Sequence, residues 1–213
     1  MIDKNDYTFP FDTCEAPKSK FFAQPYSVVV NICSTIMVLY FLCKTRTTHA
    51  FLLLLSLLAF DLSHTFSHFT HIKSKLQITL VHVLAYLLNF AFFYALYKHT
   101  NKAPTLPFLL LLLGILSFDV YAFFNLSLLF YIFTQILFFF SVFIYYYGAL
   151  SSNMKQKLNV LLLFIGLVYL GFVNEAINCK KMLKYYPNFP FHAIIEVLIL
   201  FAVYFFCQTF YTI

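Results

Sequence analysis

Four ionisable side chains lie on one face of the second strongly apolar segment of this chain. Asp61, His64, His68 and His71 are spaced by three and four residues, so a helix would place them in one stripe. Ionisable groups are costly in hydrocarbon and usually mark a site when they occur there. Histidine is also the side chain that most often binds metals in proteins. The stripe therefore predicts a metal or catalytic site inside a membrane helix.

A second pair of potential ligands opens the last apolar segment. His192 and Glu196 are four residues apart and share a helical face. Together with one histidine of the stripe they make a His/His/Glu set, which with one open position is an arrangement found in catalytic zinc sites. Zinc in such a site lowers the pKa of a bound water to about 7. We therefore predict a Zn²⁺ site in which His71 or His68 joins His192 and Glu196.

The composition places the chain in a membrane. Of its 213 residues, 62% are hydrophobic and 10% are charged, and its mean hydropathy is +0.82. We expect an all-α membrane protein, a bundle of seven transmembrane helices over residues 26–213, after an extramembrane segment over residues 1–25 without a cleavable signal peptide. The expected spans are roughly 26–43, 48–69, 76–98, 104–125, 126–148, 158–177 and 191–212.

Ionisable residues from several of these spans fall at one depth of the bundle. Successive helices alternate in direction, so position along each span gives its depth. The residues near the face that carries the N-terminus are His68, His71, His82, Asp119, Glu175, His192 and Glu196. A shared layer of this kind indicates a site inside the bundle. We expect His64, Asp61 and Glu175 to support the metal ligands.

The charge pattern excludes one class of partner. The net charge of +6 is spread over the loops and forms no basic arm or patch, so we do not expect nucleic-acid binding. The basic residues are divided between the two sides of the membrane and therefore do not set the orientation. The expected partner is a membrane lipid, and the oligomeric state stays open.

Two motifs resemble those of the alkaline ceramidases, which belong to the CREST superfamily of seven-helix membrane hydrolases. Ser67-x-x-x-His71 is similar to the Ser-x-x-x-His near the end of their second helix. His192-Ala-Ile-Ile-Glu196 is similar to the His-Ala-x-x-His opening their seventh helix, with Glu in place of the second histidine. Counting from Ser67 without gaps puts His82 at the position of a family aspartate, as if a carboxylate and an imidazole had been exchanged. A register shifted by one residue instead puts His68 on the family histidine.

Two loop segments extend the resemblance. Residues 11–15, Phe-Asp-Thr-Cys-Glu, are similar to the family segment before the first helix, and residues 174–179 are similar to the element after the sixth. The resemblance implies a disulfide between Cys14 and Cys179. It also implies a lumenal N-terminus, in the endoplasmic reticulum or Golgi.

The calcium segment of the family is incomplete in this chain. Asp12 and Glu15 match two of its ligands, whereas Pro17 and Tyr26 stand where the family has Asn and Glu. The resemblance therefore implies Zn²⁺ and gives only part of a Ca²⁺ site.

The activity that the resemblance implies is zinc-dependent hydrolysis of a lipid amide, such as ceramide to a sphingoid base and a fatty acid. Ser67 would donate to the developing oxyanion, and His82 would accept the proton of the attacking water. Three alternatives stay open: a non-enzymatic lipid-binding or receptor-like member of the superfamily, a hydrolase of GPI or phospholipid acyl groups, and a di-iron oxygenase. A di-iron site of the desaturase type needs several histidine clusters, and this chain has seven histidines in all.

Overall fold

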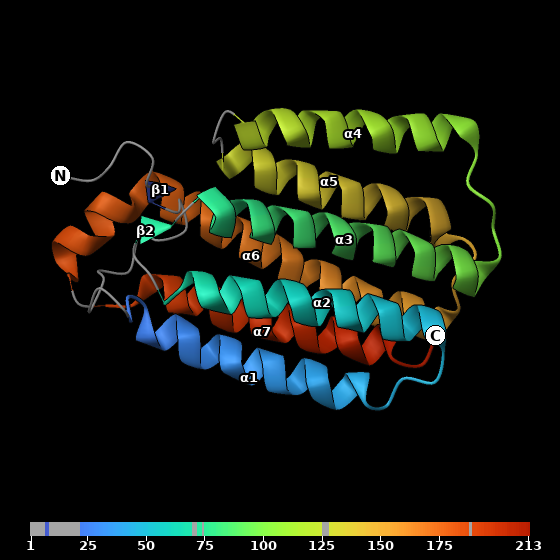
Figure 1. Cartoon of the computed structure of the whole chain (residues 1–213), viewed down its shortest axis with the longest axis horizontal. Helices are drawn as coiled ribbons and strands as arrows, with labels where there is room; N and C mark the ends of the chain where they lie inside the picture. Colours follow the sequence, from blue (N-terminus) through green and yellow to red (C-terminus); the bar gives the residue numbers. More distant parts are fainter. Residues whose placement is uncertain (1–6, 9–21, 70–71, 74, 125–127, 188) are drawn as a thin grey trace.

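The described residues of the computed structural model form seven α-helices, which run along its long axis (Figure 1). The structure describes the chain except for residues 1–6, 9–21, 70–71, 74, 125–127 and 188. The helices are α1 (Pro25–Leu42), α2 (Thr48–Ser67), α3 (Lys75–Thr100), α4 (Leu106–Phe124), α5 (Leu128–Tyr147), α6 (Ser152–Tyr185) and α7 (Phe191–Phe210). Two short strands, β1 (Tyr7–Thr8) and β2 (Ile72–Lys73), accompany them.

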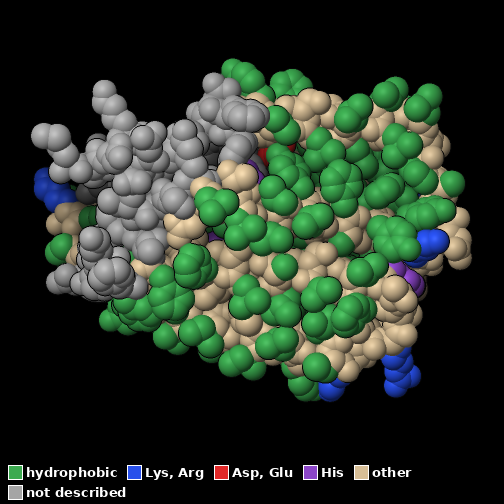
Figure 2. Space-filling view, in the orientation of Figure 1, with side chains coloured by type: hydrophobic (Ala, Val, Ile, Leu, Met, Phe, Trp, Pro, Cys, Tyr) green, Lys and Arg blue, Asp and Glu red, His purple; other side chains and the backbone are tan. Residues whose placement is uncertain are grey.

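The all-helical class predicted from the sequence is confirmed, and its helices are compatible with the predicted membrane protein. Among the described residues, α1, α2 and α7 and long stretches of α3 and α6 make five helices long and apolar enough to cross a membrane. The described parts of α4 and α5 give shorter apolar helices, so seven crossings stay a prediction. Figure 2 shows a surface dominated by hydrophobic side chains, with Lys and Arg towards the ends of the long axis. This surface is compatible with an integral membrane protein.

Helix α6 is longer than the apolar run predicted. It has 34 residues, so at 1.5 Å per residue it is about 51 Å long, whereas the hydrocarbon core of a bilayer is about 30 Å thick. The helix begins at Ser152, ahead of the predicted start at residue 158. Its start is capped by the Ser151 side chain, which accepts a hydrogen bond from the backbone N–H of Met154. It ends just before Pro187, which disfavours helix in the residue ahead of it. Hydropathy detects only the part of α6 that suits hydrocarbon.

The interior of the bundle is apolar at one end and polar at the other. Helix α2 packs against α1, α3 and α7, and α7 packs against α1, α2 and α6. Along α2, the buried residues Leu53, Leu54 and Leu57 give way to buried Asp61 and His64. Along α7, which starts with polar His192 and Glu196, the buried residues further on are mostly apolar, such as Val203, Phe206 and Phe210. The polar ends of the two helices therefore meet.

The chain ahead of α1 is tied to the end of α2. The backbone N–H of Ala23 donates to Phe69 O at 3.0 Å, and the backbone N–H of Gln24 donates to His68 O at 3.2 Å. Pro25, which needs no N–H partner, then opens α1. Further out, β1 pairs antiparallel with β2. These bonds place the Gln24 side chain beside the polar end of the bundle.

Candidate metal centre

Three imidazoles surround one carboxylate at the polar end of the bundle. Glu196 Oε1 lies 3.1 Å from His192 Nε2, 3.3 Å from His68 Nε2 and 3.7 Å from His64 Nε2. The Nε2 atoms of His64 and His68 are 3.2 Å apart. We call these four residues the His/Glu cluster. Within it, ligand atoms of His64, His68 and Glu196 all lie within 4.8 Å of one another, which is close enough for one metal ion.

The closest polar atoms of the cluster are buried, and those of His192 and Glu196 do not form hydrogen bonds of acceptable geometry with one another. His68, His192 and Glu196 are at most 1% exposed. Within the described part of the chain, His192 Nε2 and both Glu196 oxygens have no hydrogen-bond partner of acceptable geometry. A buried carboxylate without compensation costs several kcal/mol, and buried unsatisfied polar atoms commonly mark an ion or a water. The donor set therefore fits a metal cation.

The outer nitrogens of two cluster histidines have partners that orient the rings. His192 Nδ1 donates to Glu175, with Oε1 and Oε2 at 2.9 and 3.0 Å. His68 Nδ1 pairs with Gln24 Oε1. Metal-binding histidines usually donate their other N–H in this way, which fixes the ring and directs the second nitrogen at the metal. Glu175 and Gln24 thus direct the Nε2 atoms of His192 and His68 towards Glu196.

The helices supply these groups through local spacing and close packing. His64 lies on α2 and His68, four residues later, is its C-cap with helical backbone angles, while His192 and Glu196 are four residues apart on α7. A Cβ on Gly171 of α6 would lie only 3.1 Å from Ile195 Cγ1 of α7. The glycine therefore allows α6 and α7 to approach closely, one turn before Glu175.

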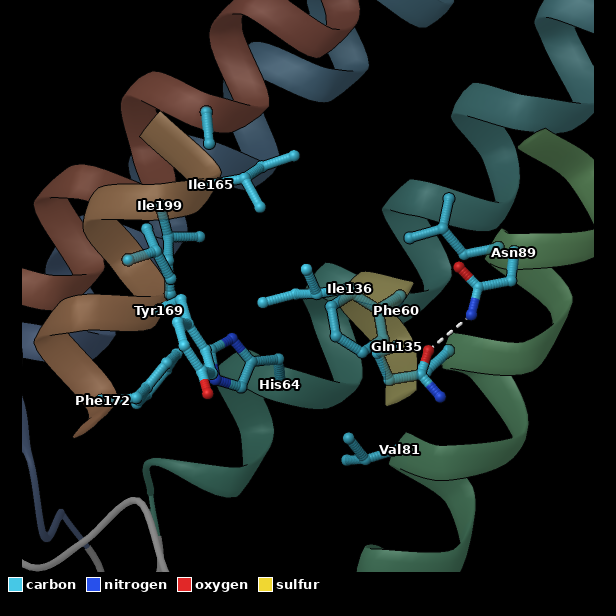
Figure 3. A pocket seen from close by; sticks show the side chains of 14 residues that line it. Phe60, His64, Val81, Asn89, Gln135, Ile136, Ile165, Tyr169, Phe172 and Ile199 are labelled. Carbon is cyan, nitrogen blue, oxygen red and sulfur yellow. Dashed lines mark hydrogen bonds between the residues drawn. The ribbon is translucent and has the colours of Figure 1, made fainter. Parts of the chain in front are cut away.

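An apolar pocket reaches the cluster through His64. Its volume is about 270 Å³, and its lining comes from α2, α3, α5, α6 and α7. His64 is the member of the cluster that lines it, and Figure 3 shows the His64 ring beside Tyr169 and Phe172. We call this cavity the apolar pocket. Its position would bring a hydrocarbon chain next to the cluster.

The structure brings His68 together with His192 and Glu196. This is the histidine of the register that the sequence left as an alternative; His71 lies outside the described residues. His64, expected among the supporting residues, contacts the same carboxylate at the longest distance of the three imidazoles.

Three other predicted site residues lie outside the cluster. Ser67 Oγ donates to the backbone O of His64 at 2.6 Å, a bond within its own helix. His82 is buried on α3 and is not part of the potential metal group found among the described residues. Asp61 accepts hydrogen bonds from Ser34 Oγ at 2.9 Å and Thr35 Oγ1 at 2.6 Å. The carboxylate of Asp61 is thus held by α1, one turn before His64.

Asp119 belongs to a second polar network. Its carboxylate accepts hydrogen bonds from Thr134 Oγ1 and, at 2.6 Å, from Gln135 Nε2. Gln135 Oε1 in turn accepts a bond from Asn89 Nδ2. The network joins α3, α4 and α5. The sequence predicted that Asp119 shares one layer with His192 and Glu196. In the structure, Asp119 belongs to a hydrogen-bond network separate from the His/Glu cluster.

Sequence reasoning missed Gln24 and Asn31. Asn31 is 1% exposed, and within the described residues neither of its side-chain polar atoms has a hydrogen-bond partner. It lies one turn before Ser34, which reaches Asp61, and about two turns after Gln24, which reaches His68. An asparagine within the apolar run of α1 was a visible signal, since amides are rare in hydrocarbon.

The predicted disulfide falls partly outside the described residues. Cys14 lies among the residues that are not described. Cys179 is buried, and the free cysteines of the described part are Cys33, Cys43 and Cys207. The Cys14–Cys179 pairing stays a prediction.

Comparison with protein-family models, curated proteins and solved structures finds no match. The resemblance to alkaline ceramidases therefore rests on the short motifs alone.

Proposed function

We propose that this chain is a zinc-dependent hydrolase that cleaves a lipid amide within the membrane, in the manner of a ceramidase. The observation that carries the proposal is the His/Glu cluster, where three imidazoles converge on one buried carboxylate beside an apolar pocket. Metal ligands next to a cavity suited to hydrocarbon are what a metal-dependent hydrolase of lipids would require.

His68, His192 and Glu196 would hold the metal. Each of the two histidines places its Nε2 within 3.3 Å of Glu196 Oε1, and the three residues form a His/His/Glu set. A zinc ion bound there would supply an activated water and polarise the carbonyl of the substrate. His64 lies farther from the carboxylate and faces the pocket, so the open side of the site is beside His64.

The remaining roles belong to residues around the cluster. Glu175 and Gln24 orient the two ligand histidines. Phe60 and Phe172 line the approach and exclude water. Ser67 is bonded to its own helix, and His64 is the cluster histidine that lines the pocket, so His64 would accept the proton of the attacking water.

The lipid-amide substrate and the cellular location rest on the family resemblance. A ceramide would place its amide at the cluster and one of its hydrocarbon chains in the pocket. The same resemblance favours the endoplasmic reticulum or Golgi, with the N-terminus in the lumen. Ca²⁺ plays no part in the proposal.

The test is release of fatty acid and sphingoid base from ceramide by the purified protein, measured by mass spectrometry. We expect hydrolysis by the wild type, loss of hydrolysis in Glu196→Gln, and retention in His99→Ala, a histidine at the far end of α3. Undiminished hydrolysis by Glu196→Gln would exclude the cluster as the catalytic site.

A second candidate is a lipid-binding or receptor-like protein with a structural metal. The observation in its favour is that the cluster offers four potential ligands, since structural zinc sites are closed by four and catalytic sites keep one position open. Protein that retains zinc and binds lipid, yet cleaves neither ceramide nor a phospholipid or GPI acyl group, would favour this candidate.

A further inference from the structure

Two amide side chains line the apolar pocket away from the cluster. Asn89 comes from α3 and Gln135 from α5, while most of the lining is aliphatic or aromatic. Figure 3 shows this pair on the side opposite Tyr169 and Phe172. A polar pair in an otherwise apolar pocket is the usual means by which a binding site fixes the orientation of its ligand.

The hydrogen-bond network sets which way the two amides point. Because the Asp119 carboxylate only accepts hydrogen bonds, Gln135 turns its N–H towards Asp119 and its oxygen towards Asn89. Thr134 occupies the other carboxylate oxygen. Within the described residues, these bonds leave Asn89 Oδ1 and one N–H of each amide available. The pair therefore offers both an acceptor and donors.

Helix association alone does not account for the position of the amides. Polar residues often join membrane helices, and this network does connect α3, α4 and α5. Side chains that served only this purpose would be turned away from the cavity. Asp119 and Thr134 do not line the pocket, whereas Asn89 and Gln135 do. The amides stand between the network and the pocket.

The pocket is long enough to hold part of a hydrocarbon chain. Val81 and Asn89 both line it from α3, and eight residues of helix span about 12 Å. His64 is near the end of α2, and Val81 is near the start of α3. These two helices are antiparallel neighbours, so His64 and Val81 mark the same end of the bundle. Asn89 lies farther along the pocket from that end.

We propose that Asn89 and Gln135 bind a hydroxyl group carried part-way along the hydrocarbon chain of the lipid. A hydroxyl both donates and accepts, so it matches the atoms that the pair leaves available. The pocket then prefers hydroxylated chains to plain chains of the same length. This inference deepens the proposed function, because it takes the cluster as the site of the lipid's carbonyl group.

Binding of free fatty acids tests the preference without hydrolysis. The probes are octadecanoic acid and a series of octadecanoic acids with one hydroxyl at successive carbons, and their dissociation constants are measured on the purified full chain by native mass spectrometry. We expect the acid with its hydroxyl at one particular mid-chain carbon to bind about tenfold more tightly than octadecanoic acid. A tenfold difference corresponds to one buried hydrogen bond. Asn89→Leu should remove this preference and keep binding of the plain acid.

A matched variant tests whether the pocket holds the chain. Ala85 lines the pocket one turn before Asn89. Ala85→Leu should weaken the plain and the hydroxylated acids equally, because it fills space and leaves the amides in place. The inference is overturned if no position of the hydroxyl improves binding, if Asn89→Leu keeps the preference, or if neither acid binds folded protein. Failure of the hydrolase proposal would look different: no ceramide cleavage, with the preference intact.

Discussion

At the scale of single residues, the geometry of the His/Glu cluster depends on the hydrogen-bond partners of its histidines. Glu175 fixes His192, and Gln24 fixes His68, from segments far apart in the chain. Both histidines therefore direct their Nε2 atoms at the Glu196 carboxylate. A metal bound between them would give a partner to His192 Nε2 and to the Glu196 oxygens, which have none among the described residues.

Glu175→Gln should weaken zinc binding about 10- to 100-fold, because it replaces the carboxylate that accepts the N–H of His192. Competition with a chromophoric chelator measures the affinity. Asn174→Ala, at an exposed neighbouring position, is the control and should bind zinc like the wild type. Equal affinity for zinc in Glu175→Gln and the control would show that the Glu175 carboxylate does not strengthen a zinc ligand at His192.

The choice between the two registers of α2 gives a second prediction. His68→Ala should lose zinc more severely than Glu175→Gln, because it removes a ligand rather than the partner of a ligand. The His71→Ala variant should keep its bound zinc. Metal content of the two purified variants decides the matter, and loss of zinc in His71→Ala alone would favour the other register.

At the scale of the elements, the site depends on how closely α6 approaches α7. Gly171→Val should push on Ile195, which lies between His192 and Glu196 on α7. We expect a loss of about 1–3 kcal/mol in stability from the overpacking, together with reduced zinc content. Thermal unfolding and elemental analysis measure the two effects.

Gly166→Ala is the matched control on the same helix, because an added Cβ there meets nothing within 4 Å. It should leave zinc content unchanged. If Gly171→Val and Gly166→Ala behave alike, the close approach of α6 and α7 does not position the ligands.

The disulfide belongs to the same scale, because it would tie the segment before α1 to α6. We expect peptide mapping without reductant to recover Cys14 and Cys179 in one linked fragment. Recovery of both as free thiols would remove this tie, and with it the argument for a lumenal N-terminus.

Local spacing explains which parts of the site could be predicted from the sequence. His192 and Glu196 share a face because of the helix repeat, so their pairing needed no tertiary information. Which histidine of α2 meets them depends on the rotation of α2 against α7 and on the backbone bonds that hold its end to Gln24. The Asn89–Gln135–Asp119 network joins three helices and has no local signal. The full length of α6 was missed because hydropathy does not report helix outside the hydrocarbon.

At the scale of the whole molecule, the bundle separates a packed apolar half from a polar half. Aromatic residues such as Phe92, Phe138 and Phe210 fill the first, and the His/Glu cluster and the apolar pocket occupy the second. This division places the His/Glu cluster beside the apolar pocket and against a packed apolar interior.

The metal content of gently purified protein tests the central claim most directly. We expect about one zinc ion per chain in the wild type, since the cluster offers a single set of ligands, and a large loss of zinc in His192→Ala. A folded wild type without a transition metal, or a His192→Ala variant that keeps its zinc, would contradict the account.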